Sequence, residues 1–323
     1  MSLRQDMLRA ARRAKAALPD AGAAAAFVRG QALPDGGFRD RSGKADLYYS
    51  VFGLQCLLAL DALDEPAATG RSEPAATDHS EPAAEAAGYS RTRTERYLGS
   101  FANPRALDLV HAACLARCWA LVRPRHPAGR AGIGRALVER IEAFRSADGG
   151  YHPVAGSAAG SAYGCFLSLG AWQDLGLEPP DAAGIVRCVR ALRVPGGGYT
   201  NEASLPFASA PATAAAALVL AEFGQPADES AAAYLANCVH PSGGLVAMIG
   251  APAADLLSTA TGLHALARMG VPPAPSAAAA ALGFVADLML EDGGFRGSQD
   301  DREADCEYTF YGLLALGHLA GGH

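Results

Sequence analysis

A recurring turn of two glycines followed by an aromatic residue constrains the fold of this chain more than any other feature. The turn occurs at residues 36–38, 149–151, 197–199 and 293–295, with an aliphatic variant at residues 243–245 and a weaker version at residues 99–101. From residue 99 onward the turns recur at a period near 50 residues, which is typical of a repeat architecture with two helices in each unit. Two glycines permit backbone angles closed to other residues, so each pair can end one helix and redirect the chain.

Each turn leads into a polar loop and then into a strongly apolar segment. These segments predict one set of helices at residues 47–60, 107–121, 160–173, 211–223, 256–268 and 306–319. More amphipathic segments predict a second set at residues 89–98, 130–145, 181–192, 227–237 and 275–290. A ring of buried helices inside a ring of half-exposed helices satisfies both patterns, whereas an open solenoid would expose the apolar set. The sequence therefore predicts an all-α fold, an α6–α6 toroid of about six helical hairpins.

The chain is expected to form one toroid domain over residues 1–323, interrupted by an insert at residues 65–88. The insert repeats an eight-residue unit that begins Glu-Pro-Ala-Ala, and such a composition cannot bury a core, so we expect it to be disordered. Residues 4–30 predict one or two short helices, with Met7, Ala11 and Leu18 on one face and arginines opposite. We interpret them as packing helices, with a membrane-surface helix as the alternative.

Composition narrows the class of function. The formal net charge is -6 and no polybasic tract is present, which argues against nucleic acid as a partner. The seven cysteines are scattered in apolar runs, as expected in a reducing compartment. The N-terminal segment is rich in arginine and lacks the apolar core of a signal peptide, and no run of ~18 apolar residues predicts a membrane span. We therefore expect a cytoplasmic protein.

The first and last repeats show a longer shared pattern: Gly-Gly-Phe, a polar loop, then Asp and an aromatic-rich helix that contains Gly-Leu. It is carried by residues 36–54 and 293–316. This pattern resembles the repeat of the prenyltransferase and squalene-cyclase family, and it is most similar to the beta subunits of protein prenyltransferases of the Rab geranylgeranyl type. The resemblance implies an isoprenyl diphosphate bound in the central cavity. It also implies a zinc ion held by Asp, Cys and His, and a helical partner like the alpha subunit of those enzymes.

The zinc ligands of that family are mostly replaced in this chain. Carrying the family pattern over puts Asp255 at the Asp position, Leu257 at the Cys position and Tyr308 at the His position. Leucine cannot bind zinc, so the inherited site is not expected, and no metal ligand is assigned. A rearranged zinc site that uses Asp305, Cys306 and His111 is the alternative.

Acidic residues stand just before several of the predicted inner helices, and in the toroid they would surround one mouth. The candidate catalytic residues are Asp46, Asp108, His111, Asp255, Asp305, Cys306 and Tyr308. Each Asp alone is also a good helix N-cap, which is the competing interpretation. Gathered at one mouth, however, such groups raise one another's pKa and can serve in acid–base chemistry.

The loops of the first and last repeats carry basic and phenolic side chains. The candidate substrate-binding residues are Arg39, Arg41, Lys44, Tyr48, Tyr49, Arg296 and Arg302. In a closed ring these two repeats are neighbours, so their cations can together hold a diphosphate through charge-assisted hydrogen bonds. Solvated loop charges are the alternative interpretation. Aromatic residues such as Tyr163, Phe166 and Tyr311 are assigned to the core, with ligand walls as the alternative.

The leading functional hypothesis is therefore an isoprenoid transferase that binds a prenyl diphosphate inside the toroid. Two alternatives remain open: a non-catalytic toroid that binds a lipid or a protein partner, and an enzyme like a terpene cyclase.

Overall fold

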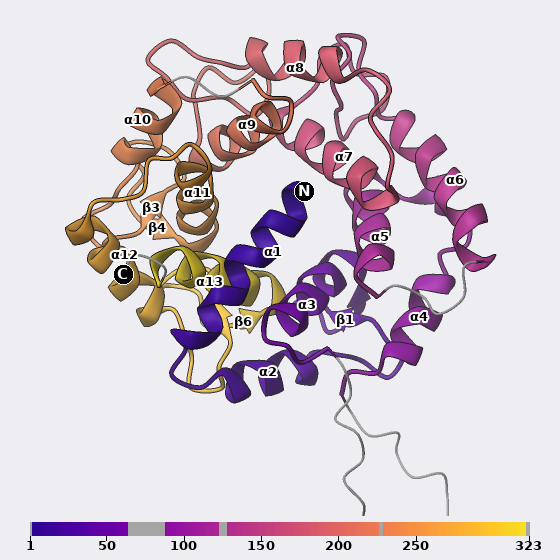
Figure 1. Ribbon diagram of the computed structural model, residues 1–323, viewed down its shortest axis with the longest axis horizontal. Coiled ribbons are helices and arrows are strands. Elements are labelled where there is room, and N and C mark those ends of the chain that lie inside the picture. The colour runs from indigo at the N-terminus through magenta and orange to yellow at the C-terminus, as the bar shows by residue number, and fades with distance from the viewer. Residues whose placement is uncertain (1, 64–87, 123–127, 226–228, 321–323) are drawn as a thin grey trace, which may run out of the picture.

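The helices form two concentric rings (Figure 1). The computed structural model describes residues 2–63, 88–122, 128–225 and 229–320. The inner ring consists of α3 (Leu47–Ala59), α5 (Leu109–Val122), α7 (Ala162–Leu175), α9 (Ala210–Glu222), α11 (Leu256–Arg268) and α13 (Cys306–Leu319). The outer ring consists of α2 (Ala21–Gly30), α4 (Arg91–Gly99), α6 (Ala128–Glu142), α8 (Ala182–Ala191), α10 (Glu229–Asn237) and α12 (Pro275–Asp287). The predicted all-α toroid is confirmed, and the predicted helix boundaries fall within a few residues of those observed.

The ring closes between its first and last repeats, where α13 packs against α3 as the other inner neighbours pack against each other. At one mouth the first residue of an inner helix donates a backbone hydrogen bond to the loop of the next repeat. This holds for Ala162 to Asn201, for Ala210 to Ala247 and for Leu256 to Gly297, at 2.8–2.9 Å. The loops that precede the inner helices therefore lie side by side around this mouth.

Each turn is fixed to the inner helix that follows it. In the first repeat Gly36 has a φ of 99°, and the backbone N–H of Phe38 donates to Ser50 Oγ at 2.9 Å. The fully buried ring of Phe38 packs against Gly53, where a Cβ would lie 2.3 Å from the ring. Only glycine leaves room for the ring at this helical position, so the turn and the helix specify each other.

The loops also contain short antiparallel strand pairs that the sequence analysis treated only as polar loops. They are β1 (Phe38–Arg39) with β2 (Ala45–Asp46), β3 (Leu245–Val246) with β4 (Ala254–Asp255), and β5 (Phe295–Arg296) with β6 (Ala304–Asp305). Each pair brings the end of its loop back to the turn, and β2, β4 and β6 end at the Asp that begins the next inner helix.

Helix α1 (Leu3–Arg13) lies across the ring rather than in either of its layers (Figure 1). It contacts the C-terminal ends of inner helices: Leu3 N–H donates to Gln173 of α7, and Asp6 pairs with Arg268 of α11. A 3₁₀ turn, Ala14–Ala16, connects it toward α2. The two N-terminal packing helices agree with the sequence analysis, but the position of α1 across one end of the barrel was not predicted.

Arg4 anchors α1 to the interior of the ring. Its Nη1 lies 3.3 Å from Asp174 of α7, whose other oxygen accepts from Arg117 of α5 at 2.8 Å. All three side chains are at least nine-tenths buried. Buried charges are stable only when they are paired, so this ion network positions α1 relative to α5 and α7.

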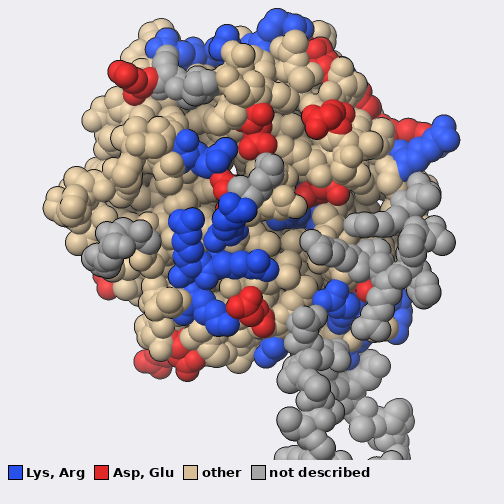
Figure 2. All heavy atoms as spheres, viewed as in Figure 1, with Lys and Arg blue, Asp and Glu red and all other residues tan. Residues whose placement is uncertain are grey.

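The outer face of α1 is basic. Figure 2 shows Lys and Arg side chains gathered on the face of the molecule where α1 lies. Arg9, Arg12, Arg13 and Lys15 are exposed there. This end of the barrel is therefore covered by a cationic surface.

Two further predictions concern the insert and the absence of a membrane span. The predicted disordered insert lies outside the described residues, except for Gly88. Among the described residues, no helix has both the length and the apolar character needed to cross a bilayer.

Candidate functional site

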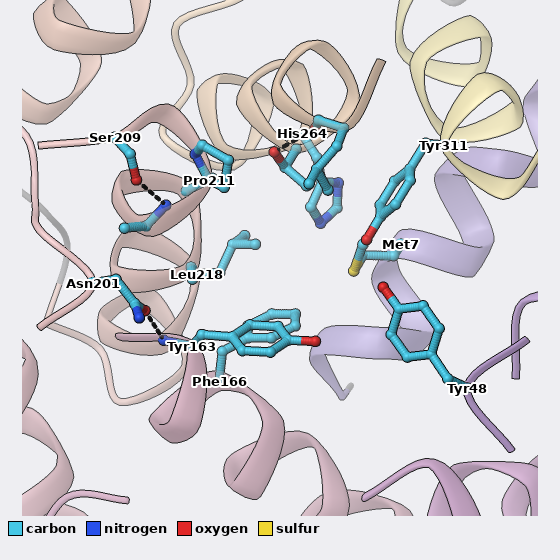
Figure 3. Close-up of a pocket in the computed structure, with 15 residues that line it drawn as sticks. Met7, Tyr48, Tyr163, Phe166, Asn201, Ser209, Pro211, Leu218, His264 and Tyr311 are labelled. Carbon is cyan, nitrogen blue, oxygen red and sulfur yellow. Dashed lines mark hydrogen bonds between the residues drawn. The ribbon is translucent and has the colours of Figure 1, made fainter. Parts of the chain in front are cut away.

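A cavity of about 350 Å³ occupies the centre of the ring (Figure 3). Its wall comes from all inner helices except α5, and Met7 of α1 lies at its base, toward the C-terminal ends of those helices. The side of α9 facing the cavity is built from small residues, including Ala212, Ala214 and Ala215, which leave the space open. No Lys, Arg, Asp or Glu is among the described residues that line it. The cavity is therefore suited to an apolar ligand.

Three phenols form the main polar feature of the cavity. The hydroxyl groups of Tyr48, Tyr163 and Tyr311 point toward one another in the cavity (Figure 3). They come from α3, α7 and α13, so the ring must close before they can meet. The sequence predicted Tyr163 and Tyr311 as core residues, with ligand walls as the alternative, and the structure places both on the cavity wall.

Glu307 lies directly beside this group of phenols. Tyr48 donates its hydroxyl hydrogen to Glu307 Oε1 at 2.6 Å. Burial raises the pKa of Glu307 to about 7, and the hydrogen bond from Tyr48 opposes that shift. A carboxyl group that exchanges its proton near neutral pH is suited to acid–base chemistry.

Sequence reasoning missed Glu307 because an acidic residue in the first turn of a helix is ordinary. Such a residue complements the positive end of the helix dipole and needs no further role. Glu307 is half-buried, and its hydrogen-bond partner Tyr48 comes from another repeat. Only the unusual density of ionisable and phenolic residues in Asp305-Cys306-Glu307-Tyr308 pointed to this segment.

The predicted carboxylates gather at the same mouth and also cap the inner helices. Asp46, Asp255 and Asp305 are the N-caps of α3, α11 and α13, and each accepts a hydrogen bond from a backbone N–H of its helix. Asp108 accepts from the backbone N–H of His111 at 2.8 Å. Capping explains why these residues precede the helices, and it does not conflict with a second role.

His111 connects two of these carboxylates. Its Nδ1 lies 2.8 Å from Asp108 Oδ2, and its Nε2 lies 3.2 Å from Asp46 Oδ2. The hydrogen bond with Asp46, more than any other contact, raises the pKa of His111 to about 9. The imidazolium therefore joins α3 to α5 at neutral pH, on the rim of the toroid. None of the three residues lines the central cavity.

The basic side chains of the first and last repeats meet, as the closed ring predicts, but they are largely paired with acids. Arg41 Nε lies 2.8 Å from Asp305 Oδ2, and Arg41 Nη2 lies 2.7 Å from Asp301 Oδ2. The same guanidinium lies over the ring of Tyr308, 5.4 Å from its centre. Burial raises the pKa of Asp305 despite Arg41, and burial also raises the pKa of Tyr49 to about 12.

The other predicted cations lie around the same junction. Arg39 donates to Gln31, and Arg296 donates to the backbone oxygen of Gln299 in its own loop. Lys44 and Arg302 are exposed. A second hollow, of about 480 Å³, lies here and is lined by both signs of charge, including Arg39, Arg41 and Arg302 against Asp40, Asp292, Glu303 and Asp305. It is distinct from the apolar cavity, whose described lining includes none of these cations.

The residues present do not suit a zinc ion of the kind found in protein prenyltransferases. Cys306 is buried, and burial raises the pKa of its thiol, whereas His111 is held between two carboxylates. Across the part of the chain that the structure describes, no three His, Cys, Asp or Glu side chains are placed to hold a metal ion.

The comparisons with known proteins agree with the architecture. Residues 6–87 and 151–321 match the model of the prenyltransferase alpha-alpha toroid domain. The type II terpene cyclase MstE from Scytonema aligns with a TM-score of 0.59 at 15% identity, covering 97% of this chain and 98% of that chain. No curated protein sequence matches the chain.

Two further solved structures show the same likeness. An MstE variant in complex with geranylgeranyl dihydroxybenzoate gives a TM-score of 0.56 at 14% identity, covering 97% of each chain. A protein from Actinoplanes gives a TM-score of 0.57 at 15% identity, covering 96% of this chain and 97% of that chain. At these identities the likeness concerns the fold alone.

Proposed function

Because the chain belongs to the prenyltransferase alpha-alpha toroid domain family, we propose that it binds an isoprenyl group in its central cavity. The observation that carries the proposal is the cavity itself, which is apolar, is closed toward one end by α1 and has a volume of about 350 Å³. That volume lies at the lower end of the range for small-molecule sites, and a flexible hydrocarbon chain fits such a space. Burial of the hydrocarbon provides the binding free energy.

The rim supports entry of an apolar ligand. Large apolar side chains are exposed in the loops of three neighbouring repeats: Val154 in one, Leu205 and Phe207 in the next, and Met248 and Ile249 in the third. An isoprenyl chain that crosses these loops stays in contact with apolar surface between solvent and cavity. Isolated apolar residues on a surface need no explanation, but a group beside the mouth of an apolar cavity favours a hydrophobic ligand.

A diphosphate head group, in this proposal, stays at the mouth while the hydrocarbon enters the cavity. The exposed Lys44 and Arg302 are the cations available to it, because Arg41 already pairs with two carboxylates. The reaction that we propose is transfer of the prenyl group to an acceptor. The proposal includes a helical partner protein like an alpha subunit.

Glu307 favours a second candidate, a reaction like that of a terpene cyclase. Such an enzyme needs a proton donor beside a hydrocarbon, and Glu307 is a half-buried carboxyl with a pKa near 7 next to the phenols of the cavity. The MstE variant that shares this fold was solved with geranylgeranyl dihydroxybenzoate, so a toroid of this shape holds a ligand with a geranylgeranyl chain.

Binding is tested with farnesyl diphosphate and geranylgeranyl diphosphate, by thermal shift and by release of pyrophosphate. At a ligand concentration 100 times Kd, we expect stabilisation of about 2.7 kcal/mol, seen as a rise of several degrees in Tm. Release of pyrophosphate supports an enzyme that uses the diphosphate, and a shift without release supports a binder or a reaction at the hydrocarbon.

A matched pair of variants locates the binding. Leu218→Trp fills the cavity from α9 and should abolish the shift, whereas Leu282→Trp on the exposed face of α12 should keep it. Circular dichroism checks that both variants are folded. An absence of any shift with the wild-type protein, or an equal shift in Leu218→Trp, contradicts the proposal.

A further inference from the structure

The base of the cavity is not entirely apolar. Thr261 and His264 lie three residues apart on α11, so both face the same side of the helix and both line the cavity. They share the lining with Met7 of α1 and Leu218 of α9. Thr261 stands six residues past the N-cap of α11, as Tyr311 does in α13, and His264 lies about one helical turn deeper. Figure 3 shows the imidazole of His264 directed from α11 into the cavity.

His264 has one bonded nitrogen and one unpartnered nitrogen. Its Nδ1 lies 2.9 Å from Nε2 of His318 on α13, so this nitrogen is satisfied. Its Nε2 has no hydrogen-bond partner among the described residues, and the side chain is only 1% exposed. A buried polar atom without a partner costs about 1–3 kcal/mol, and native proteins seldom leave one unless a ligand or water meets it.

Both imidazoles are neutral at physiological pH. Burial lowers the pKa of His264 to about 3 and that of His318 to about 4, and Arg268 and Arg13, respectively, contribute in the same direction, while Asp6 opposes the shift of His318. The unpartnered nitrogen therefore belongs to a neutral ring, which does not attract an anion strongly. A carboxylate or phosphate at this depth would lose its hydration without gaining a counter-charge.

The hydrogen bond between the two rings determines what the free nitrogen can do. If His264 donates from Nδ1, then its Nε2 is an acceptor; if His318 donates, then His264 Nε2 carries a hydrogen and is a donor. A hydroxyl group satisfies either arrangement because it both donates and accepts. Thr261 adds an acceptor, since its hydroxyl hydrogen goes to the backbone oxygen of Leu257 at 2.7 Å and leaves an oxygen lone pair.

We propose that the ligand carries a hydroxyl group on the end that reaches the base of the cavity, and that His264 Nε2 and Thr261 Oγ1 bind it. The proposal rests on the proposed function, because it assumes that an isoprenoid occupies this cavity. It adds the chemical class of the ligand's inner end: an isoprenoid alcohol rather than a plain hydrocarbon or an acid.

The test compares two ligands that differ only in this group: farnesyl diphosphate and its analogue with a hydroxyl group on the terminal carbon, the end of the chain opposite the diphosphate. Affinities for the wild-type protein, for His264→Leu and for Thr261→Val are measured by thermal shift over a range of concentrations. The wild-type protein should bind the hydroxylated ligand about 3- to 10-fold more tightly, as one neutral hydrogen bond predicts. His264→Leu should remove most of this preference, Thr261→Val a smaller part, and His264→Gln should restore some of it.

A second measurement does not depend on the variants. In ¹⁵N NMR of the wild-type histidine side chains, the hydroxylated ligand should shift the Nε2 resonance of His264 more than farnesyl diphosphate does. Equal affinities of the wild-type protein for both ligands, or a preference for the hydroxylated ligand that survives His264→Leu, overturn the inference while leaving the proposed function intact. Failure of every isoprenyl diphosphate to bind overturns the two together.

Discussion

At the scale of single residues, Glu307 and Tyr48 place a carboxyl group and a phenol beside an apolar space. Their hydrogen bond joins the last repeat to the first, so the pair exists only because the ring closes. The cost of ionising Glu307 is set by its burial, and its pKa near 7 shows that the cost is substantial. Ionisable groups with such a raised cost of ionisation are common at functional sites, where a protein keeps a group that does not favour stability.

The pH dependence of stability tests the state of Glu307. Its pKa is raised in the folded protein, so its contribution to stability is present at low pH and is lost as the pH rises from the unfolded value of 4.5 through about 7. Glu307→Gln cannot ionise, so it should be more stable than the wild-type protein at pH 8, by on the order of 2 kcal/mol, with the difference shrinking toward pH 4. Urea unfolding at several pH values measures this.

Glu303→Gln is the control for that measurement, because Glu303 is exposed on the same segment of chain. Its difference from the wild-type protein should stay small at every pH. A Glu307→Gln curve parallel to that of the wild-type protein across this range would show that Glu307 ionises normally.

Residue-level roles were harder to predict than residue positions. The carboxylates before the inner helices could be predicted at the mouth, because an N-cap is a local signal and the repeats are in register. The partners of these carboxylates could not be predicted from sequence, because the contacts of His111 with Asp46 and of Arg41 with Asp305 join different repeats. The two functions proposed for Glu307 and His264 depend on burial, which neighbouring elements create.

At the scale of elements, α1 gives the barrel an open end and a covered end. It lies across the C-terminal ends of the inner helices, and the open end is formed by the loops at their N-termini. The amphipathic pattern of residues 4–18 correctly predicts a packing helix, but it does not reveal what the helix packs against. The repeat motif is absent from α1, so its place in the ring depends on contacts such as Arg4 with Asp174, distant in sequence.

The buried ion network supplies a test of how α1 is held. Asp174→Asn leaves Arg4 and Arg117 buried beside each other without a counter-charge, and we expect it to lower the free energy of unfolding by about 3–5 kcal/mol. Denaturant unfolding measures the loss. Asp61→Asn is the matched control: Asp61 pairs with Lys15 of the turn after α1 at 3.0 Å, but both side chains are exposed.

Asp61→Asn should lower the free energy of unfolding by less than about 1 kcal/mol, because exposed ion pairs contribute little to stability. Asparagine also tolerates the positive φ of 56° at this position. Losses of equal size in the two variants would mean that the buried network does not hold α1 in place.

At the scale of the whole molecule, the fold follows from the repeated turn, loop and inner helix, whereas the cavity depends on side chains that differ from one repeat to the next. Turn, loop and inner helix recur with enough regularity that the toroid could be predicted from sequence. The open space depends on where small residues such as Ala212 and Ala215 face inward and where Tyr311 does not fill the centre. Side-chain direction within a helix that is apolar all round carries no periodic signal, so the cavity's shape was beyond sequence reasoning.

The most direct measurement of the central claim is a crystal structure of the protein grown with geranylgeranyl diphosphate. We predict continuous density for the isoprenyl chain along α9 and α11, passing the phenols of Tyr48 and Tyr163 and ending near Met7 and Leu218. Density for the isoprenyl chain outside the ring, with side chains filling the central cavity, would contradict it.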